Sequence, residues 1–324
     1  MIATACRYET PSRKMTRMRP GKYSGSRVMG CPPALLLLYL DLLLYNPPMK
    51  YFDAHTHVQF AAYDVDRAET VARALEAGVG MNVVGTQIDT SRAALAVAQQ
   101  YDGVWATIGL HPVHTSKSYH DTKELGEGGQ EFTSRGEVFD FAAYEALGRD
   151  PKVIAIGECG LDYYRVDEST KAIQVETFVQ QIELANALGK PLMLHIRNGV
   201  GEANAYLNAL ELIKSHAKVQ GDVHFFAGDW EIAQKFLDSG FTLSFTGVVT
   251  FTHDYDEVVR NTPLDMILSE TDAPYITPVP YRGKRNESAY IPHIVEAIAR
   301  IKSEDIETVR TQLLENARRV FGVT

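Results

Sequence analysis

The chain has 324 residues, of which 45% are apolar and 23% charged, proportions that indicate a soluble globular enzyme with one large domain or two ordinary ones. Its three cysteines, Cys6, Cys31 and Cys159, lack metal-ligand spacing and cannot all pair. This argues against a disulfide-stapled secreted protein and favours a reducing cytoplasm.

The formal charge of −9 is unevenly distributed. Residues 1–50 contain eight Lys or Arg and two acidic residues, which leaves 24 basic and 39 acidic side chains, a balance of −15, in the rest of the chain. Such a body repels polyanions at long range. Any contact with nucleic acid must therefore depend on a few local cations rather than on a broad basic face.

The first fifty residues are rich in Arg, Ser, Gly and Pro and contain one apolar run, 34–45, interrupted by Asp41. Twelve residues are too few to span a bilayer, and the run lacks the cleavage site of a secretory signal. Met49 precedes the first predicted strand, where an initiator methionine is expected. We interpret 1–48 as an N-terminal extension, disordered or non-native upstream sequence, and 49–324 as a cytoplasmic domain without membrane association.

From residue 50 onward, β-branched apolar runs alternate with amphipathic segments, the pattern of β/α units. The predicted strands are 50–54, 80–86, 104–109, 153–157, 191–195, 222–225, 242–245 and 266–269. The predicted helices include 68–77, 92–100, 170–188, 203–215, 231–237, 254–261, 291–301 and 304–320. Eight strands over this length predict a (β/α)₈ TIM barrel.

A doubly wound open sheet is the alternative fold, but no Gly-x-Gly-x-x-Gly loop follows the first strand. The polar, Gly-rich segment 114–135 follows the third strand, where a barrel places an active-site loop. We interpret it either as a lid that shapes the substrate site or as a disordered surface loop.

Six potential metal ligands each follow or end an apolar run, at points where the strands are expected to end. They are His55, His57, Glu158, His195, His224 and Asp272. Each has an ordinary explanation by itself, such as a core histidine, a loop salt bridge or an Asx-turn. In a parallel barrel, however, strand ends meet at one face, so a single metal site explains all six together.

Four imidazoles and two carboxylates exceed the ligand number of one tetrahedral ion and suit two ions bridged by a carboxylate. We predict two divalent ions, zinc, manganese or magnesium; the nitrogen-rich ligand set favours zinc, manganese or iron over magnesium. Two such ions lower the pKa of bound water from about 15.7 to about 7. Hydrolysis is therefore the expected chemistry.

Together with these residues, several motifs resemble the TatD family of metal-dependent hydrolases and deoxyribonucleases. They are Asp-Ala-His-Thr-His (53–57), Gly-Leu-His-Pro (109–112), Gly-Glu-Cys-Gly-Leu-Asp-Tyr-Tyr (157–164), His-Ile-Arg (195–197), Glu-Thr-Asp-Ala-Pro-Tyr (270–275) and Arg-Gly-Lys-Arg-Asn-Glu (282–287). The resemblance covers the chain from about Met49 to its end. It departs at 224–228, where His-Phe-Phe-Ala-Gly replaces the usual His-Cys-Phe-Ser-Gly, and in a longer loop after the third strand.

The resemblance implies a (β/α)₈ barrel with two divalent ions. By analogy His55, His57 and Asp272 hold the first ion, His195 and His224 hold the second, and Glu158 bridges them. Asp272 also orients or deprotonates the attacking water. The expected phosphate-binding residues are His111, Arg165, Arg197, Arg282, Lys284 and Arg285.

The leading functional prediction is a metal-dependent phosphodiesterase, either a 3′–5′ exonuclease or a general deoxyribonuclease that acts on DNA ends. A dinuclear hydrolase for a small amide, lactone or carboxyl ester is the alternative, because fold does not settle substrate. A binding protein without catalysis is a third class, against which the complete ligand set argues. Nothing in the sequence predicts the oligomeric state.

Overall fold

The computed structural model describes residues 48–117, 119–120, 132–164, 166–199 and 204–324. The predicted extension 1–48 lies almost entirely outside these residues, as does most of the segment 114–135. Residues 46–324 form one compact unit, and the fold described below is that of this unit alone.

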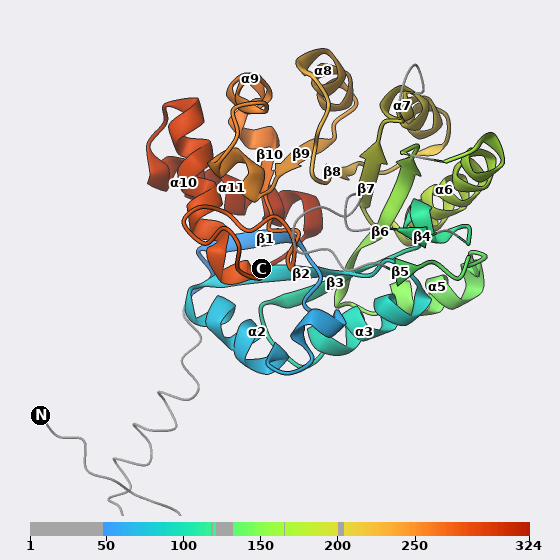
Figure 1. The fold of residues 1–324 in the computed structure, drawn as a ribbon, viewed down its shortest axis with the longest axis horizontal. Coiled ribbons are helices and arrows are strands. Elements are labelled where there is room, and N and C mark those ends of the chain that lie inside the picture. Colours follow the sequence, from blue (N-terminus) through green and yellow to red (C-terminus); the bar gives the residue numbers. More distant parts are fainter. Residues whose placement is uncertain (1–47, 118, 121–131, 165, 200–203) are drawn as a thin grey trace, which may run out of the picture. The chain divides into compact units, whose positions relative to one another are not determined.

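Eight parallel strands form one sheet in the order β1-β2-β3-β6-β7-β8-β9-β10, and helices surround it (Figure 1). The strands are β1 (Tyr51–Thr56), β2 (Val79–Val84), β3 (Val104–Ile108), β6 (Val153–Asp162), β7 (Leu192–Arg197), β8 (Gly221–Val223), β9 (Thr242–Phe245) and β10 (Ile267–Ser269). A parallel bridge between Thr56 and Ala273 connects β1 to the residues after β10. The predicted (β/α)₈ barrel is confirmed, with all eight strands near their predicted positions.

The helices lie between successive strands and cover the outside of the barrel. They are α2 (Arg67–Glu76), α3 (Ile88–Ala98), α5 (Phe141–Gly148), α6 (Glu168–Leu188), α7 (Ala205–His216), α8 (Trp230–Asp238), α9 (Asp256–Asn261), α10 (Ile291–Lys302) and α11 (Ile306–Phe321). Several begin at an acidic cap: Asp229 Oδ1, for example, accepts the Ile232 N–H at 2.9 Å at the start of α8. Within the described residues, every helix is too short or too polar to cross a membrane.

The segment after β3 contains a short antiparallel ladder, β4 (Tyr119–His120) paired with β5 (Phe132–Thr133), which the sequence did not predict. Helix α5 follows it and was also not predicted. The interpretation of 114–135 as a lid or a surface loop concerns mainly 121–131, which lie outside the described residues.

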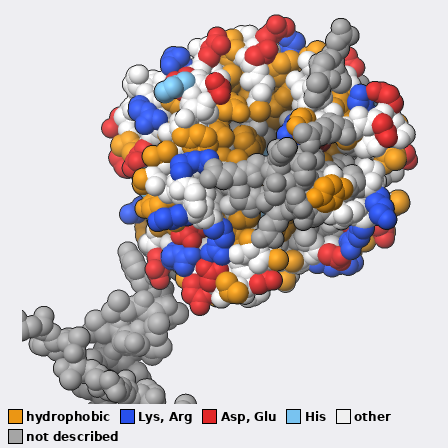
Figure 2. All heavy atoms as spheres, in the orientation of Figure 1, with side chains coloured by type: hydrophobic (Ala, Val, Ile, Leu, Met, Phe, Trp, Pro, Cys, Tyr) orange, Lys and Arg blue, Asp and Glu red, His pale blue; other side chains and the backbone are white. Residues whose placement is uncertain are grey.

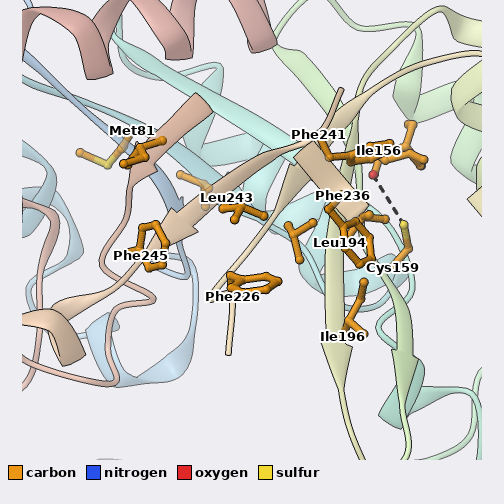
Figure 3. Close-up of a cluster of buried hydrophobic side chains, with 14 of the residues drawn as sticks. Met81, Ile156, Cys159, Leu194, Ile196, Phe226, Phe236, Phe241, Leu243 and Phe245 are labelled. Carbon is orange, nitrogen blue, oxygen red and sulfur yellow. Dashed lines mark hydrogen bonds between the residues drawn. The ribbon is translucent and has the colours of Figure 1, made fainter. Parts of the chain in front are cut away.

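The hydrophobic core fills the space between the strands and their covering helices. In Figure 3, side chains from β7, β8–β9 and α8, among them Leu194, Phe226 and Phe236, point toward one another, and all three are at most 1% exposed. Burying a side chain of this size stabilises the fold by about 1.5–3 kcal/mol. This packing holds β6, β7 and β8 side by side. Two of the six predicted ligands lie in β6 and β7, and a third directly follows β8.

Candidate metal centre

The six predicted ligands lie at the carboxyl-terminal side of the barrel. His55 is in β1 and His57 follows it, Glu158 is in β6, His195 is in β7, His224 follows β8, and Asp272 lies three residues beyond β10. Two of these strands are longer than predicted, because β6 continues past Glu158 to Asp162 and β7 continues past His195 to Arg197. These two ligands are therefore inside their strands rather than at their ends.

Closure of the barrel brings Asp272 beside the His-x-His pair. The Asp272 N–H donates to the His55 carbonyl oxygen at 2.9 Å, and the His57 N–H donates to that of Ala273 at 2.8 Å. Beneath them the buried Asp53 carboxylate accepts the backbone N–H groups of His55 and Thr271 at 3.2 and 2.9 Å. These hydrogen bonds place Asp272 Oδ1 3.4 Å from His57 Nε2.

Close packing of backbones brings Glu158 into the centre. A side chain at Gly157 would overlap the Met193 carbonyl oxygen of β7, and one at Gly109 would lie 2.5 Å from the carbonyl of Gly157. Glycine at both positions lets the chain after β3, β6 and β7 approach one another at this level. The Glu158 carboxylate, which is 3% exposed, is thereby held among the histidines.

The two oxygens of Glu158 face different histidines. Oε2 lies 3.4 Å from His55 Nε2 and 3.9 Å from His57 Nε2. Oε1 lies 2.8 Å from His195 Nδ1 and 3.3 Å from His224 Nε2. His111 Nε2 is also 3.3 Å from Oε1. The carboxylate thus has one oxygen in each of two clusters of nitrogen atoms.

This donor set fits divalent cations. Three overlapping groups have all their ligand atoms within 4.8 Å of one another: His55, His57 and Asp272; His55, Glu158 and His224; and His111, Glu158 and His195. The Nε2 atoms of His55 and His57 are 3.2 Å apart. Two nitrogens bound at about 2.1 Å to one tetrahedral zinc ion would be about 3.4 Å apart. The spacing is therefore that of two ligands on one ion.

The electrostatics of the cluster keep its carboxylates ionised. Burial opposes ionisation of Glu158, but the imidazoles of His111, His224 and His55 hold the pKa of its carboxyl well below the usual range. Burial likewise opposes ionisation of Asp272, whose pKa is lowered by its hydrogen bond to His57 and by His224. Both groups can therefore present negative charge to a cation at neutral pH.

The partner of the second ring nitrogen indicates where each imidazole carries its proton. His57 Nδ1 lies 2.8 Å from the Val84 carbonyl oxygen, so it donates, and Nε2 keeps its lone pair for a cation. His111 is the opposite case, because its Nδ1 accepts the Val113 N–H at 3.2 Å. Neutral His111 therefore carries its proton on Nε2, which makes it a hydrogen-bond donor in the site instead of an obvious ligand.

A cleft of about 450 Å³ opens over these residues. The polar residues that line it include His57, His111, Glu158, Asp162, His195, Arg197, His224 and Asp272, and the apolar ones include Phe60, Val113, Ile196, Phe225, Ala227, Tyr275 and Ile276. A reacting group bound there would meet both the histidine cluster and aromatic and aliphatic side chains.

The predicted phosphate-binding cations differ in position. Arg197 lines the cleft, with its guanidinium 4.0 Å from the centre of the Tyr164 ring. Arg282, Lys284 and Arg285 are not among the described residues that line it. Arg285 instead binds both oxygens of Asp66, at 2.8 and 2.6 Å. Arg165 lies outside the described residues.

Sequence reasoning missed three residues at the centre. Asp162 Oδ2 lies 3.1 Å from His195 Nε2, and Glu270 Oε1 lies 3.3 Å from His224 Nδ1. His114 lines the cleft, with its Nδ1 3.2 Å from Ser134 Oγ. Two motifs could have pointed to the carboxylates. Asp162 lies in Gly-Leu-Asp-Tyr-Tyr, shortly after Glu158, and Glu270 lies in Glu-Thr-Asp, shortly before Asp272.

Known proteins resemble this chain over nearly all of the described region. The profile of the family described as TatD related DNase matches residues 52–322. An uncharacterized metal-dependent hydrolase, YabD of Bacillus subtilis, is 36% identical over 275 residues, which are 84% of this chain and 99% of that protein. The 3′-5′ ssDNA/RNA exonuclease TatD of Klebsiella pneumoniae is 34% identical over 285 residues, covering 84% of this chain and 98% of the relative.

A solved structure has the same fold. The crystal structure of YjjV, a TatD homologue from Escherichia coli, superposes with a TM-score of 0.72 at 25% identity, covering 85% of this chain and 99% of that one. The profile match and the extent of similarity to the curated relatives confirm the predicted family. The chain belongs to the TatD-related DNase family and is a metal-dependent hydrolase.

Proposed function

We propose that this hydrolase cleaves phosphodiester bonds at the ends of nucleic acids, as a 3′–5′ exonuclease or general deoxyribonuclease, with water activated between two divalent ions. The observation that carries the proposal is the position of Glu158, whose Oε2 faces the His55 and His57 nitrogens and whose Oε1 faces those of His195 and His224. A carboxylate between two ligand sets is the arrangement expected of a two-ion hydrolase.

In this proposal His55, His57 and Asp272 hold the first ion, His195 and His224 hold the second, and Glu158 bridges them. Bound divalent ions would supply Lewis acidity toward a phosphoryl oxygen and would lower the pKa of water toward about 7. Asp272 remains ionised and lines the cleft, so it can orient the attacking water and accept its proton.

His111 and Arg197 bind the phosphate in this scheme. The Val113 N–H occupies His111 Nδ1, so the proton on Nε2 is available to a phosphate oxygen. Arg197, which also lines the cleft, adds a permanent positive charge. Arg282, Lys284 and Arg285 remain predicted contacts for more distant phosphates, and the role of Arg165 remains a prediction too.

The nucleic-acid substrate is supported by the exonuclease activity named for relatives such as the Klebsiella protein. Basic and acidic side chains both occur around the edge of the face shown in Figure 2, which suits a short single-stranded end more than a long duplex. The aromatic surface beside the histidines, which includes Phe60 and Tyr275, can pack against a base or sugar.

Hydrolysis of a small amide, lactone or carboxyl ester is the second candidate. It is favoured by the strongly acidic composition of the chain after residue 50 and by the apolar residues that line the cleft of about 450 Å³. Such a substrate needs the same two ions but no chain of phosphate contacts.

The deciding experiment supplies purified protein with zinc, manganese or magnesium and compares three substrates: single-stranded DNA labelled at either end, a generic aryl phosphodiester and an aryl carboxyl ester. We expect mononucleotides to be released from the 3′ end, and no release by Asp272→Asn. Cleavage of the carboxyl ester alone would reject the nuclease proposal in favour of the small-substrate one. Release from the 5′ end alone would reject the 3′–5′ direction.

A further inference from the structure

His195 differs from the other histidines around Glu158 in the ring nitrogen that it turns inward. His55, His57 and His224 face the Glu158 carboxylate with Nε2, whereas His195 faces it with Nδ1. A neutral imidazole binds a cation only through the nitrogen that lacks a proton. His195 can therefore serve as a ligand only when its proton is on Nε2.

The group that faces His195 Nε2 is Asp162, the last residue of β6. Its Oδ2 lies 3.1 Å from that nitrogen, and its Oδ1 accepts the Tyr164 N–H at 2.9 Å. The side chain of Gln174 on α6 bonds to both the N–H and the carbonyl oxygen of Asp162, each at 2.8 Å. Asp162 is 2% exposed, so its carboxylate is fixed in this orientation.

We propose that Asp162 is a positioning residue that keeps the proton of His195 on Nε2 and thereby makes Nδ1 available to the second ion. The inference rests on the proposed two-ion centre. A carboxylate oxygen can only accept a hydrogen bond, so it selects the Nε2–H form of the imidazole. Supporting groups of this kind usually change metal affinity by about 10–100-fold when they are removed.

In Asp162→Asn, the change in hydrogen-bonding groups should reverse the tautomer of His195. The carboxylate accepts from two donors, one on each oxygen, whereas an amide has one oxygen and one NH₂ group. The Tyr164 N–H can only donate and will keep the amide oxygen. The NH₂ group then faces His195 Nε2, which must accept and move its proton to Nδ1, the nitrogen required by the second ion.

Asp162→Ala has a different effect, because it removes both oxygens without supplying a donor. His195 is then free to adopt either tautomer and can still bind through Nδ1. We therefore expect the isosteric Asn variant to bind the second ion more weakly than the Ala variant does. A purely structural role predicts the reverse order, because Ala leaves a void and Asn preserves the shape.

Glu270 provides a matched control. Its Oε1 accepts the Phe225 N–H at 2.6 Å and also faces His224, while its Oε2 lies 2.8 Å from Ser244 Oγ. In Glu270→Gln the amide oxygen can remain toward Phe225 and His224, and NH₂ can donate to the Ser244 hydroxyl. This variant replaces a buried carboxyl group with an amide, as Asp162→Asn does, but it keeps an oxygen facing His224 Nδ1, so we expect no change of tautomer there.

The test is titration of the metal-free protein with Zn²⁺ against a chromophoric chelator, together with ¹⁵N NMR of the His195 ring nitrogens at a Zn²⁺ concentration that saturates the wild-type protein. Zn²⁺ is needed for the NMR because, without it, Glu158 Oε1, 2.8 Å from His195 Nδ1, can accept a proton from that nitrogen. We expect two ions per wild-type chain. Second-site affinity should fall more than 100-fold in Asp162→Asn, about 10-fold in Asp162→Ala and less than 10-fold in Glu270→Gln. The NMR spectrum should show protonated Nε2 in wild type and protonated Nδ1 in Asp162→Asn.

Two outcomes separate this inference from the proposed function. Two ions and an unchanged His195 tautomer in Asp162→Asn would overturn the positioning role and leave the two-ion centre intact. Fewer than two ions in the wild-type chain would overturn the two-ion proposal itself. If Asp162→Asn fails to fold, the metal affinity of the Ala variant and the NMR signals of wild-type His195 still test the inference. A proton on Nδ1 of His195 in the wild-type protein would contradict it.

Discussion

Asp272 Oδ1 lies 3.4 Å from Nε2 of His57, although the two residues are near opposite ends of the barrel sequence. Hydrogen bonds across the seam between β1 and the residues after β10 produce this contact. Ligands for the first ion therefore come from both sides of the seam. The hydrogen bonds that close the barrel are therefore the same ones that bring these ligands together.

The first prediction concerns Asp272 as the proton acceptor. Asp272→Asn should lower kcat by about 10²–10⁴-fold, because an amide cannot accept the proton of the attacking water. The melting temperature should change little, since the backbone bonds of Asp272 remain. Steady-state kinetics and thermal unfolding check this, with Asp229→Asn as a control, because Asn also caps a helix well. Wild-type kcat in Asp272→Asn would contradict the assignment.

The second prediction concerns Glu158 as the group shared by both ions. Glu158→Ala should lose both ions during purification, since neither cluster of imidazoles keeps its carboxylate oxygen. Metal content per chain is measured by mass spectrometry. Glu137→Gln changes another partly buried carboxylate, which accepts the Ile88 N–H and the Tyr144 hydroxyl, and it should retain both ions. A Glu158→Ala protein with two ions would refute the bridge.

The third prediction separates Arg197 from Arg285. Arg197→Ala should raise KM for a phosphodiester about 10-fold without changing stability greatly, because Arg197 lines the cleft. Arg285→Ala should leave KM for a small aryl phosphodiester unchanged, because Arg285 does not line the cleft. It should lower the free energy of unfolding by about 1 kcal/mol, through loss of its pair with Asp66. The reverse pattern in kinetics and urea denaturation would show that Arg285 is the phosphate contact.

The fourth prediction concerns pH. Burial and the neighbouring His195 lower the pKa of His111 to about 4. In the unfolded chain an imidazole has a pKa of about 6.5, so acid favours unfolding between these values. The stability that neutral His111 contributes to the metal-free protein should be present above pH 6.5 and lost as pH falls toward 4. His111→Asn should flatten this part of a plot of unfolding free energy against pH; an unchanged slope would contradict the pKa.

The sequence predicted the barrel because each strand is a short apolar run followed by an amphipathic segment. Helix α5 was not predicted because Phe141–Gly148 is short and mixes alanines with large apolar residues. Its sequence therefore does not show one apolar and one polar helix face. The length of β6 was also underestimated. A carboxylate normally ends a buried strand, but Glu158 is surrounded by imidazoles that stabilise its charge, and the strand continues to Asp162.

The convergence of the six candidate ligands could be predicted because each lies at or near the carboxyl-terminal end of a barrel strand. The contacts of Asp162 with His195 and of Glu270 with His224 could not be predicted from the sequence. They depend on which ring nitrogen of each histidine faces the Glu158 carboxylate. For Arg282, Lys284 and Arg285, too, the sequence does not show which groups face each side chain. Their run of positive charge suggests phosphate binding, yet the sequence does not reveal that Asp66 faces Arg285.

The central claim is that Glu158 lies between two metal ions. Anomalous diffraction from crystals grown with Zn²⁺ or Mn²⁺, collected at the absorption edge of that metal, tests it most directly. The account predicts two peaks within coordination distance of the Glu158 carboxylate, one beside His55, His57 and Asp272 and the other beside His195 and His224. A single peak, or two peaks of which neither contacts Glu158, would contradict it.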